Sequence, residues 1–60
     1  MFSKNLKYYR LRKGMTKKKL AEKANVTSMA ITNYEKGDRK PDMKILQALA
    51  DVLEVRVSDF

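Results

Sequence analysis

The sequence predicts an all-α fold, a compact domain of four to five short helices. Apolar residues recur at the three- and four-residue spacing of helices, and no stretch alternates apolar and polar residues as a half-buried strand would. Residues that cap or end helices separate these stretches. Sixty residues can form only one small core, so we expect a single domain over residues 1–60.

The first two helices are predicted over residues 2–13 and 16–24. Their core-facing residues are Phe2, Leu6 and Tyr9 in the first helix and Leu20, Ala21 and Ala24 in the second. Gly14 follows the first helix, where it can take the left-handed backbone that ends many helices. Thr16 can cap the start of the second helix, and Asn25 can end it.

The next two helices are predicted over residues 27–35 and 42–53. Their core-facing residues are Ile31 and Tyr34, and then Leu46, Leu49, Ala50 and Leu53. The residues placed to cap or end them are Thr27 or Ser28, Gly37 and Asp42, with Pro41 in the turn between. The closing run, residues 57–60, has the pattern of a cap and first helical turn. We therefore expect a fifth helix that is cut short at Phe60.

The positive charge is unevenly distributed along the chain. The net charge at pH 7 is +7. Residues 1–40 hold twelve Lys or Arg and three Asp or Glu, whereas residues 41–60 hold two and four. The first part of the domain therefore suits a polyanionic partner such as nucleic acid.

The sequence lacks the residues that several classes of function need. The chain has no cysteine and no histidine, which excludes disulfides, thiolate nucleophiles and the usual zinc sites. No nucleophile with a base and no glycine-rich phosphate loop can be assembled, so we expect neither an enzyme nor a cofactor, metal or small-molecule site. No apolar run spans a bilayer or forms a signal peptide. These features predict a cytoplasmic protein without membrane contact.

The link between the second and third predicted helices points to a function. Only Asn25 and Val26 separate the two helices, and so short a link forces a steep crossing that leaves the later helix protruding. The side chains on its outer face are expected to be Ser28, Met29, Thr32 and Asn33. Short polar groups on a protruding helix can reach base edges in the major groove of DNA.

An ordered set of residues covers nearly the whole chain. It consists of Arg10, Leu20-Ala21, Val26-Thr27, Ile31, Tyr34-Glu35-Lys36-Gly37, Pro41, Leu49-Ala50, Leu53, Val55 and Val57-Ser58-Asp59-Phe60. This set resembles the Cro/C1-type helix-turn-helix family, also called XRE. The resemblance implies a lambda-repressor-like fold whose second and third helices form the helix-turn-helix. It also implies a transcriptional repressor that binds double-stranded DNA as a homodimer on an inverted-repeat operator.

The resemblance also assigns roles to individual residues. The positions that read bases in the family correspond to Ser28, Met29, Thr32 and Asn33. The positions that contact phosphate correspond to Lys17, Lys18, Thr27, Lys36, Arg39 and Lys40. Arg10 and Glu35 match a pair that in many members links the first helix to the end of the third. We expect their salt bridge to hold the reading helix in place.

Four residues depart from the family pattern. Lys17 stands where the family commonly has a polar residue, often Gln. Lys19 stands where a capping box would have Glu, and three successive lysines oppose the dipole of the second helix, which favours a nearby anion such as phosphate. Glu54 occupies a turn position where Gly or Asn usually takes a positive φ, so either mild strain or a different turn is expected there. Met29 can only contact a thymine methyl group or fill the space beside it.

Two other functions stay open at the level of sequence. A cationic amphipathic peptide that acts at membranes would form its helix only with lipid, whereas a globular domain unfolds cooperatively in buffer. A protein-interaction module of the same fold, such as an antitoxin or anti-repressor, would have a more apolar outer face. Tyr8 and Leu11 are either isolated exposed residues or part of a contact with a further domain. Since no long apolar stripe remains beyond the core, we expect a free domain that is monomeric or pairs weakly.

Overall fold

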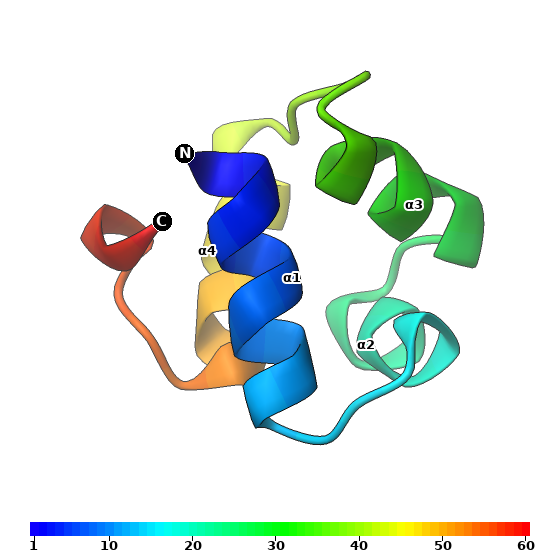
Figure 1. The fold of residues 1–60 in the computed structure, drawn as a ribbon, viewed down its shortest axis with the longest axis horizontal. Helices are drawn as coiled ribbons and strands as arrows, with labels where there is room; N and C mark the ends of the chain where they lie inside the picture. Colours follow the sequence, from blue (N-terminus) through cyan, green and yellow to red (C-terminus); the bar gives the residue numbers. More distant parts are fainter.

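The computed structural model describes residues 1–60 as four α-helices followed by a short 3-10 helix (Figure 1). The elements are α1 (Phe2–Arg12), α2 (Lys17–Ala24), α3 (Ser28–Lys36), α4 (Met43–Leu53) and η1 (Val57–Asp59). No strand is present, so the all-α prediction is confirmed. The α-helix bounds agree with the predicted ones to within one residue, because the capping residues themselves lie just outside the helices.

Side-chain caps start three of the helices. The side chains of Thr16, Thr27 and Asp42 each accept a hydrogen bond from the backbone N–H three residues later, at 3.0, 3.0 and 2.9 Å. Thr27, rather than Ser28, therefore caps α3. Each cap provides an acceptor for an N–H group that the helix itself leaves free, which stabilises a helix by about 1 kcal/mol.

Left-handed backbone follows each of the four α-helices. The φ angle is +71° at Gly14, as predicted, and +60° at Asn25, +81° at Gly37 and +58° at Glu54. Asparagine and glycine adopt this conformation readily, but a glutamate does so at a cost, so the strain expected at Glu54 is present. The Glu54 carboxylate accepts a hydrogen bond from Nζ of Lys13, which ties the C-terminal ends of α1 and α4 together.

The core lies between the four α-helices. Its fully buried large side chains are Leu6, Leu20, Ile31 and Leu49. The other buried apolar residues are Ala21, Ala24, Tyr34, Ala50 and Leu53. Phe2, Tyr9 and Leu46 were also expected in the core but are only partly buried. Ser3 and Arg10 are buried although the apolar pattern does not include them.

Phe2 and Tyr9 are partly buried because they pack against the end of the chain. The ring centroid of Phe60 lies 5.1 Å from that of Phe2 and 6.1 Å from that of Tyr9, both in edge-on geometry. Nδ2 of Asn5 also donates a hydrogen bond to the carbonyl of Phe60, at 2.8 Å. A single 3-10 turn, held against α1, thus occupies the place where the fifth helix was expected to begin.

The arrangement of the helices leaves α3 at the surface. In Figure 1, α1 runs down the front of the molecule, with α2 and α3 on one side and α4 behind it. α3 packs against α1 and α2, and α2 packs also against α4. None of the helices combines the length and the apolar character that crossing a membrane requires.

Candidate nucleic-acid interface

The connection between α2 and α3 positions the candidate interface. α2 ends at Asn25 in left-handed backbone, and the N–H of Val26 donates back to a carbonyl of α2 at 2.9 Å. Thr27 then caps α3 directly. The inner side of α3 is anchored by Ile31 and Tyr34, both buried in the core. Its opposite side consequently faces solvent.

The outward side of α3 carries the four residues predicted to read bases. Met29, Thr32, Asn33 and Lys36 form one row along the helix, because residues three, four and seven positions apart share a side. We call Met29, Thr32, Asn33 and Lys36 the outer row. Three of them were predicted to read bases, and the fourth predicted reader, Ser28, precedes Met29 in the chain. Ser28 and Met29 are exposed, and Thr32 and Asn33 are half-buried. No hydrogen bond within the domain uses the side chains of Ser28, Thr32 or Asn33.

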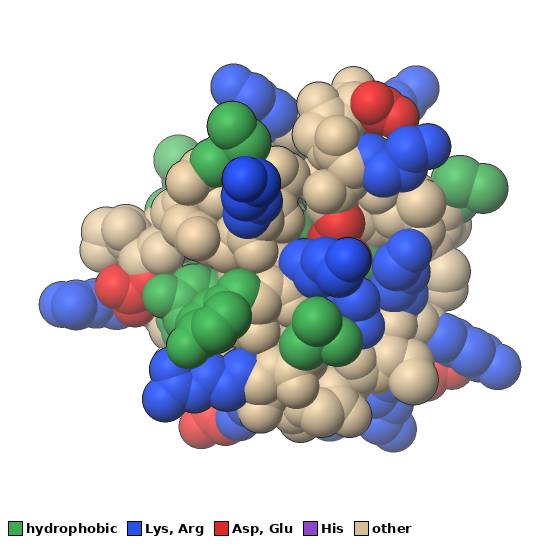
Figure 2. Space-filling model, in the orientation of Figure 1, with side chains coloured by type: hydrophobic (Ala, Val, Ile, Leu, Met, Phe, Trp, Pro, Cys, Tyr) green, Lys and Arg blue, Asp and Glu red, His purple; other side chains and the backbone are tan.

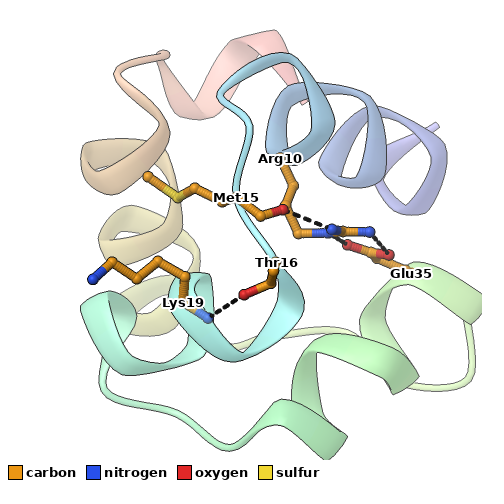
Figure 3. A network of polar contacts seen from close by, with 5 residues as sticks. All are labelled: Arg10, Met15, Thr16, Lys19 and Glu35. Atoms are coloured by element: carbon orange, nitrogen blue, oxygen red, sulfur yellow. Dashed lines mark hydrogen bonds and ion pairs between the residues drawn. The ribbon is translucent and has the colours of Figure 1, made fainter.

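Arg10 and Glu35 form the ion pair that the sequence predicts (Figure 3). Nε of Arg10 donates to Oε2 of Glu35 at 2.6 Å, and Nη2 donates to Oε1 at 3.2 Å. The two side chains are only 8% and 5% exposed. Bidentate geometry of this kind fixes orientation as well as distance. The pair therefore sets the position of α3 relative to α1.

A third contact of Arg10 was not predicted from the sequence. Its Nη1 donates a hydrogen bond to the backbone carbonyl of Met15, at 2.9 Å (Figure 3). Met15 immediately precedes Thr16, the cap of α2. One guanidinium thus joins α1, the start of α2 and the end of α3. Because a backbone carbonyl is present at every residue, no residue type in the sequence could have marked this contact.

The start of α2 carries the first group of predicted phosphate contacts. Lys17 and Lys18 are exposed in the first turn, where the helix has no acidic residue. Free backbone N–H groups and the helix dipole make this end electropositive already. Thr27, at the start of α3, accepts a hydrogen bond through its hydroxyl oxygen, which leaves the hydroxyl hydrogen available as a donor.

The second group of predicted phosphate contacts consists of the last residue of the outer row and two residues of the loop after α3. Lys36, Arg39 and Lys40 are all exposed, at the end of α3 and in the loop after it. Lys36 forms an exposed ion pair with Asp38, at 3.7 Å, which the sequence analysis did not include. Arg39 and Lys40 have no ion-pair partner within the domain.

Basic side chains dominate the surface around these elements. Figure 2 shows Lys and Arg side chains spread over one face, with few acidic side chains between them. Several reach outward at the edge where α2 and α3 lie in Figure 1. No group of three or more acidic residues is placed to hold a metal ion. The face shown in Figure 2 is therefore mainly basic.

Comparison with known proteins gives the family. A model of the family described as helix-turn-helix matches residues 6–60. The chain belongs to this family. Its membership confirms the resemblance to Cro/C1-type, or XRE, regulators, and the lambda-repressor-like fold in which α2 and α3 form the helix-turn-helix.

The similar helix-turn-helix proteins are regulators of transcription. The uncharacterized HTH-type transcriptional regulator YqaE of Bacillus subtilis (strain 168) is 44% identical over 55 residues, which are 92% of this chain and 47% of YqaE. The present chain thus spans about half the length of this curated relative. None of these proteins is described as an enzyme, in agreement with the sequence analysis.

Two solved structures share the fold. The clp gene regulator ClgR of Corynebacterium glutamicum superimposes with a TM-score of 0.92 at 26% identity, over 97% of this chain and 62% of ClgR. The Bacillus subtilis biofilm regulator SinR, in complex with DNA, gives a TM-score of 0.91 at 32% identity, over 97% of this chain and 94% of SinR. The helix-turn-helix arrangement described above is therefore shared by structures of regulators.

Proposed function

We propose that this helix-turn-helix domain binds double-stranded DNA in a sequence-specific way, as the DNA-binding part of a transcriptional repressor. α3 would lie in the major groove. Base contacts would come from Ser28, Met29, Thr32 and Asn33. Phosphate contacts would come from Lys17, Lys18, Thr27, Lys36, Arg39 and Lys40. Since its target is DNA in a bacterial or phage-infected cell, its proposed place is the cytoplasm.

The observation that carries the proposal is the outer row of α3 and the charge around it. Two members of the row, Thr32 and Asn33, have side-chain hydrogen-bonding groups that no contact within the domain uses, and a B-DNA major groove is wide enough to admit one helix. Lys17 and Lys18 are exposed in the first turn of α2, and Arg39 and Lys40 are exposed in the loop after α3, so cations that could contact phosphates belong to both ends of the motif in the sequence. The similarity to SinR, whose structure is a complex with DNA, supports the same reading.

The proposed complex is a homodimer on an inverted repeat. A single α3 spans only a few base pairs, which is too short a sequence to be unique in a genome. Two copies on half-sites about 10 bp apart place both α3 helices on one face of the duplex. The large exposed apolar residues are Met1, Tyr8, Leu11, Met29 and Met43, and among them only Tyr8 and Leu11 lie one turn apart on the same helix, so we expect little association without DNA.

Selection from a randomised duplex library tests the proposal. We expect enrichment of a symmetric sequence, and weaker binding to a scrambled duplex. Replacing Arg39 and Lys40 with Ser should weaken binding to all sequences alike, because phosphate contacts carry no sequence information. Replacing Lys44 with Ser, an exposed residue of α4, is the matched control and should have a smaller effect. No binding to any duplex at low salt would refute the proposal and favour a protein-interaction module.

A further inference from the structure

Met29 is exposed in a way that the fold does not require. Its side chain is 66% exposed, although it is a large apolar group in the first turn of α3. It is not among the side chains that pack against the core. The sequence left two roles open for Met29, contact with a thymine methyl group or the filling of space beside that group. Since the core does not take up the Met29 side chain, only a partner can bury it.

The position of Met29 in the outer row limits which group of a DNA base its side chain could contact. It is the one large exposed apolar residue of α2 and α3, and Thr32 and Asn33 lie one turn further along the same side. Its thioether donates no hydrogen bond and accepts only weakly. In the major groove, the only apolar group on a base edge is the C5-methyl group of thymine.

We propose, building on the DNA-binding function above, that Met29 recognises the C5-methyl group of one pyrimidine in each operator half-site. The recognised feature is then the methyl group and not a hydrogen-bonding pattern. Thymine satisfies it, and so does 5-methylcytosine, which carries its methyl group at the same ring position. Uracil and unmodified cytosine lack that group. Binding by this domain therefore depends on cytosine methylation whenever a cytosine occupies the position.

A methyl scan of the selected operator tests the assignment. Each thymine of the half-site is replaced in turn by uracil, which removes the methyl group and keeps every hydrogen-bonding group, and affinity is measured by fluorescence anisotropy. At one position we expect about a fourfold loss, the factor that corresponds to burial of one methyl group. At the same position, 5-methylcytosine should bind about fourfold more tightly than cytosine.

Two variants assign the effect to Met29. Met29→Ala should abolish both methyl effects while the domain keeps its helical circular dichroism, because the side chain makes no core contact. Leu11→Ala is the matched control: Leu11 is a 57% exposed apolar residue of α1, and its replacement should leave both effects intact. Met29→Gln, which keeps the length and loses the apolar character, should behave as Met29→Ala does.

The outcomes separate this inference from the function on which it rests. Binding that is insensitive to uracil at every thymine overturns the inference and leaves DNA binding standing. A methyl effect that persists in Met29→Ala also overturns it and transfers the methyl contact to another residue of the outer row, such as Thr32 through its γ-methyl group. Failure to bind any duplex refutes both.

Discussion

The guanidinium of Arg10 and the carboxylate of Glu35 are the charged groups that the fold buries most deeply, with 8% and 5% of each side chain exposed. Removal from water costs several kcal/mol per ion, as an order of magnitude, and the loss is offset only while both partners are present. The Arg10 guanidinium donates three hydrogen bonds, two to Glu35 and one to the Met15 carbonyl. Replacement of one member of the pair should therefore be costly.

Glu35→Ala should lower the free energy of unfolding by about 3 to 5 kcal/mol, more than the ~0 to 1 kcal/mol of an exposed ion pair. Urea unfolding followed by circular dichroism measures this loss. The double replacement Arg10→Met with Glu35→Leu should recover much of it, because no unpaired charge stays buried. A loss below about 1 kcal/mol for Glu35→Ala would show that the pair does not hold α1 and α3 together.

Asn33 is the residue of the outer row best suited to recognise one base, because its amide can donate to N7 and accept from the N6 amino group of adenine together. Asn33→Ala should relax the preference at one base pair of each half-site, by about 1 to 3 kcal/mol. Affinities for operators with all four bases at each position measure this preference. An equal loss on every sequence would instead identify Asn33 as a phosphate contact.

At the start of α2, the residue that would give the highest stability differs from the one that favours the proposed DNA binding. The backbone N–H of Lys19 donates to Oγ1 of Thr16 at 3.0 Å, which is half of a capping box. A glutamate at this position would complete the box by accepting a hydrogen bond from the Thr16 N–H, and it would also match the helix dipole. A lysine does neither.

Lys19→Glu should therefore raise the free energy of unfolding by about 0.5 to 1 kcal/mol and weaken DNA binding. Thermal unfolding tests the predicted gain in stability, and operator affinity, measured on the same preparation, tests the predicted loss of DNA binding. Lys23→Glu makes the same charge change in the last turn of α2, where a cation is favourable, and should destabilise the domain. Tighter DNA binding by Lys19→Glu would rule out a phosphate near this turn.

The turn after α4 predicts a pH dependence. The hydrogen bond that Lys13 donates lowers the pKa of the Glu54 carboxyl, and the positive charge of Lys13 lowers this pKa further, by a smaller amount. Since the pKa is lower in the folded state, Glu54 stabilises the domain above its unfolded pKa, and this contribution is lost as the pH falls through the folded pKa. The wild type should melt at a higher temperature than Glu54→Gln at about pH 7, and the difference should shrink as the pH falls below the unfolded pKa of about 4.3 and through the lower folded pKa.

Thermal unfolding across a pH series measures this difference. Glu22→Gln provides the control, because Glu22 is exposed and has no ion-pair partner in the domain. A difference between wild type and Glu54→Gln that stays constant into acid would show that the Lys13 contact does not persist in solution.

The features that the sequence predicted best at this scale are those that depend on neighbouring residues. Thr16, Gly37 and Asp42 mark helix ends through contacts within four positions, so their roles follow from the local pattern. The Lys13–Glu54 contact joins residues 41 positions apart and depends on the packing of α1 against the rest of the domain. No local pattern contains that information. Arg10 was predicted to pair with Glu35 only because a family resemblance supplied the distant partner.

The contacts of Ser3 and Phe60 likewise could not be predicted from the local sequence pattern. Ser3 is buried because α1 packs against the end of α3, where a side chain added at Gly37 would meet the Ser3 hydroxyl. Apolar spacing cannot identify a small polar residue of this kind. The pattern of residues 57–60 predicted a cap and first helical turn, and a single 3-10 turn is present there, but the contacts of Phe60 with Phe2 and Tyr9 were not predicted.

At the scale of the whole molecule, the charge and the small apolar surface together determine how the domain should bind. Its net charge is +7, and its exposed large apolar residues form no group larger than the pair of Tyr8 and Leu11 on α1. Free copies therefore repel each other and have little apolar surface to bury in a dimer. A DNA duplex removes the repulsion by neutralising both copies. We expect a monomer in sedimentation experiments without DNA, and cooperative binding to an operator with two half-sites.

Salt dependence provides the quantitative form of this prediction. If each copy neutralises about four phosphates, using the α2 lysines with Lys36, Arg39 and Lys40, the pair neutralises about eight. Each neutralised phosphate contributes about −0.9 to the slope of log K against log salt, so the slope should be near −7. Fluorescence anisotropy on the operator across a salt series measures it. Lys36 forms an ion pair with Asp38 in the free domain, so Asp38→Asn should raise affinity without changing the slope by more than about one phosphate. A slope shallower than about −2 would mean that the basic surface does not lie on the phosphate backbones, and the protein-interaction alternative would then account better for it.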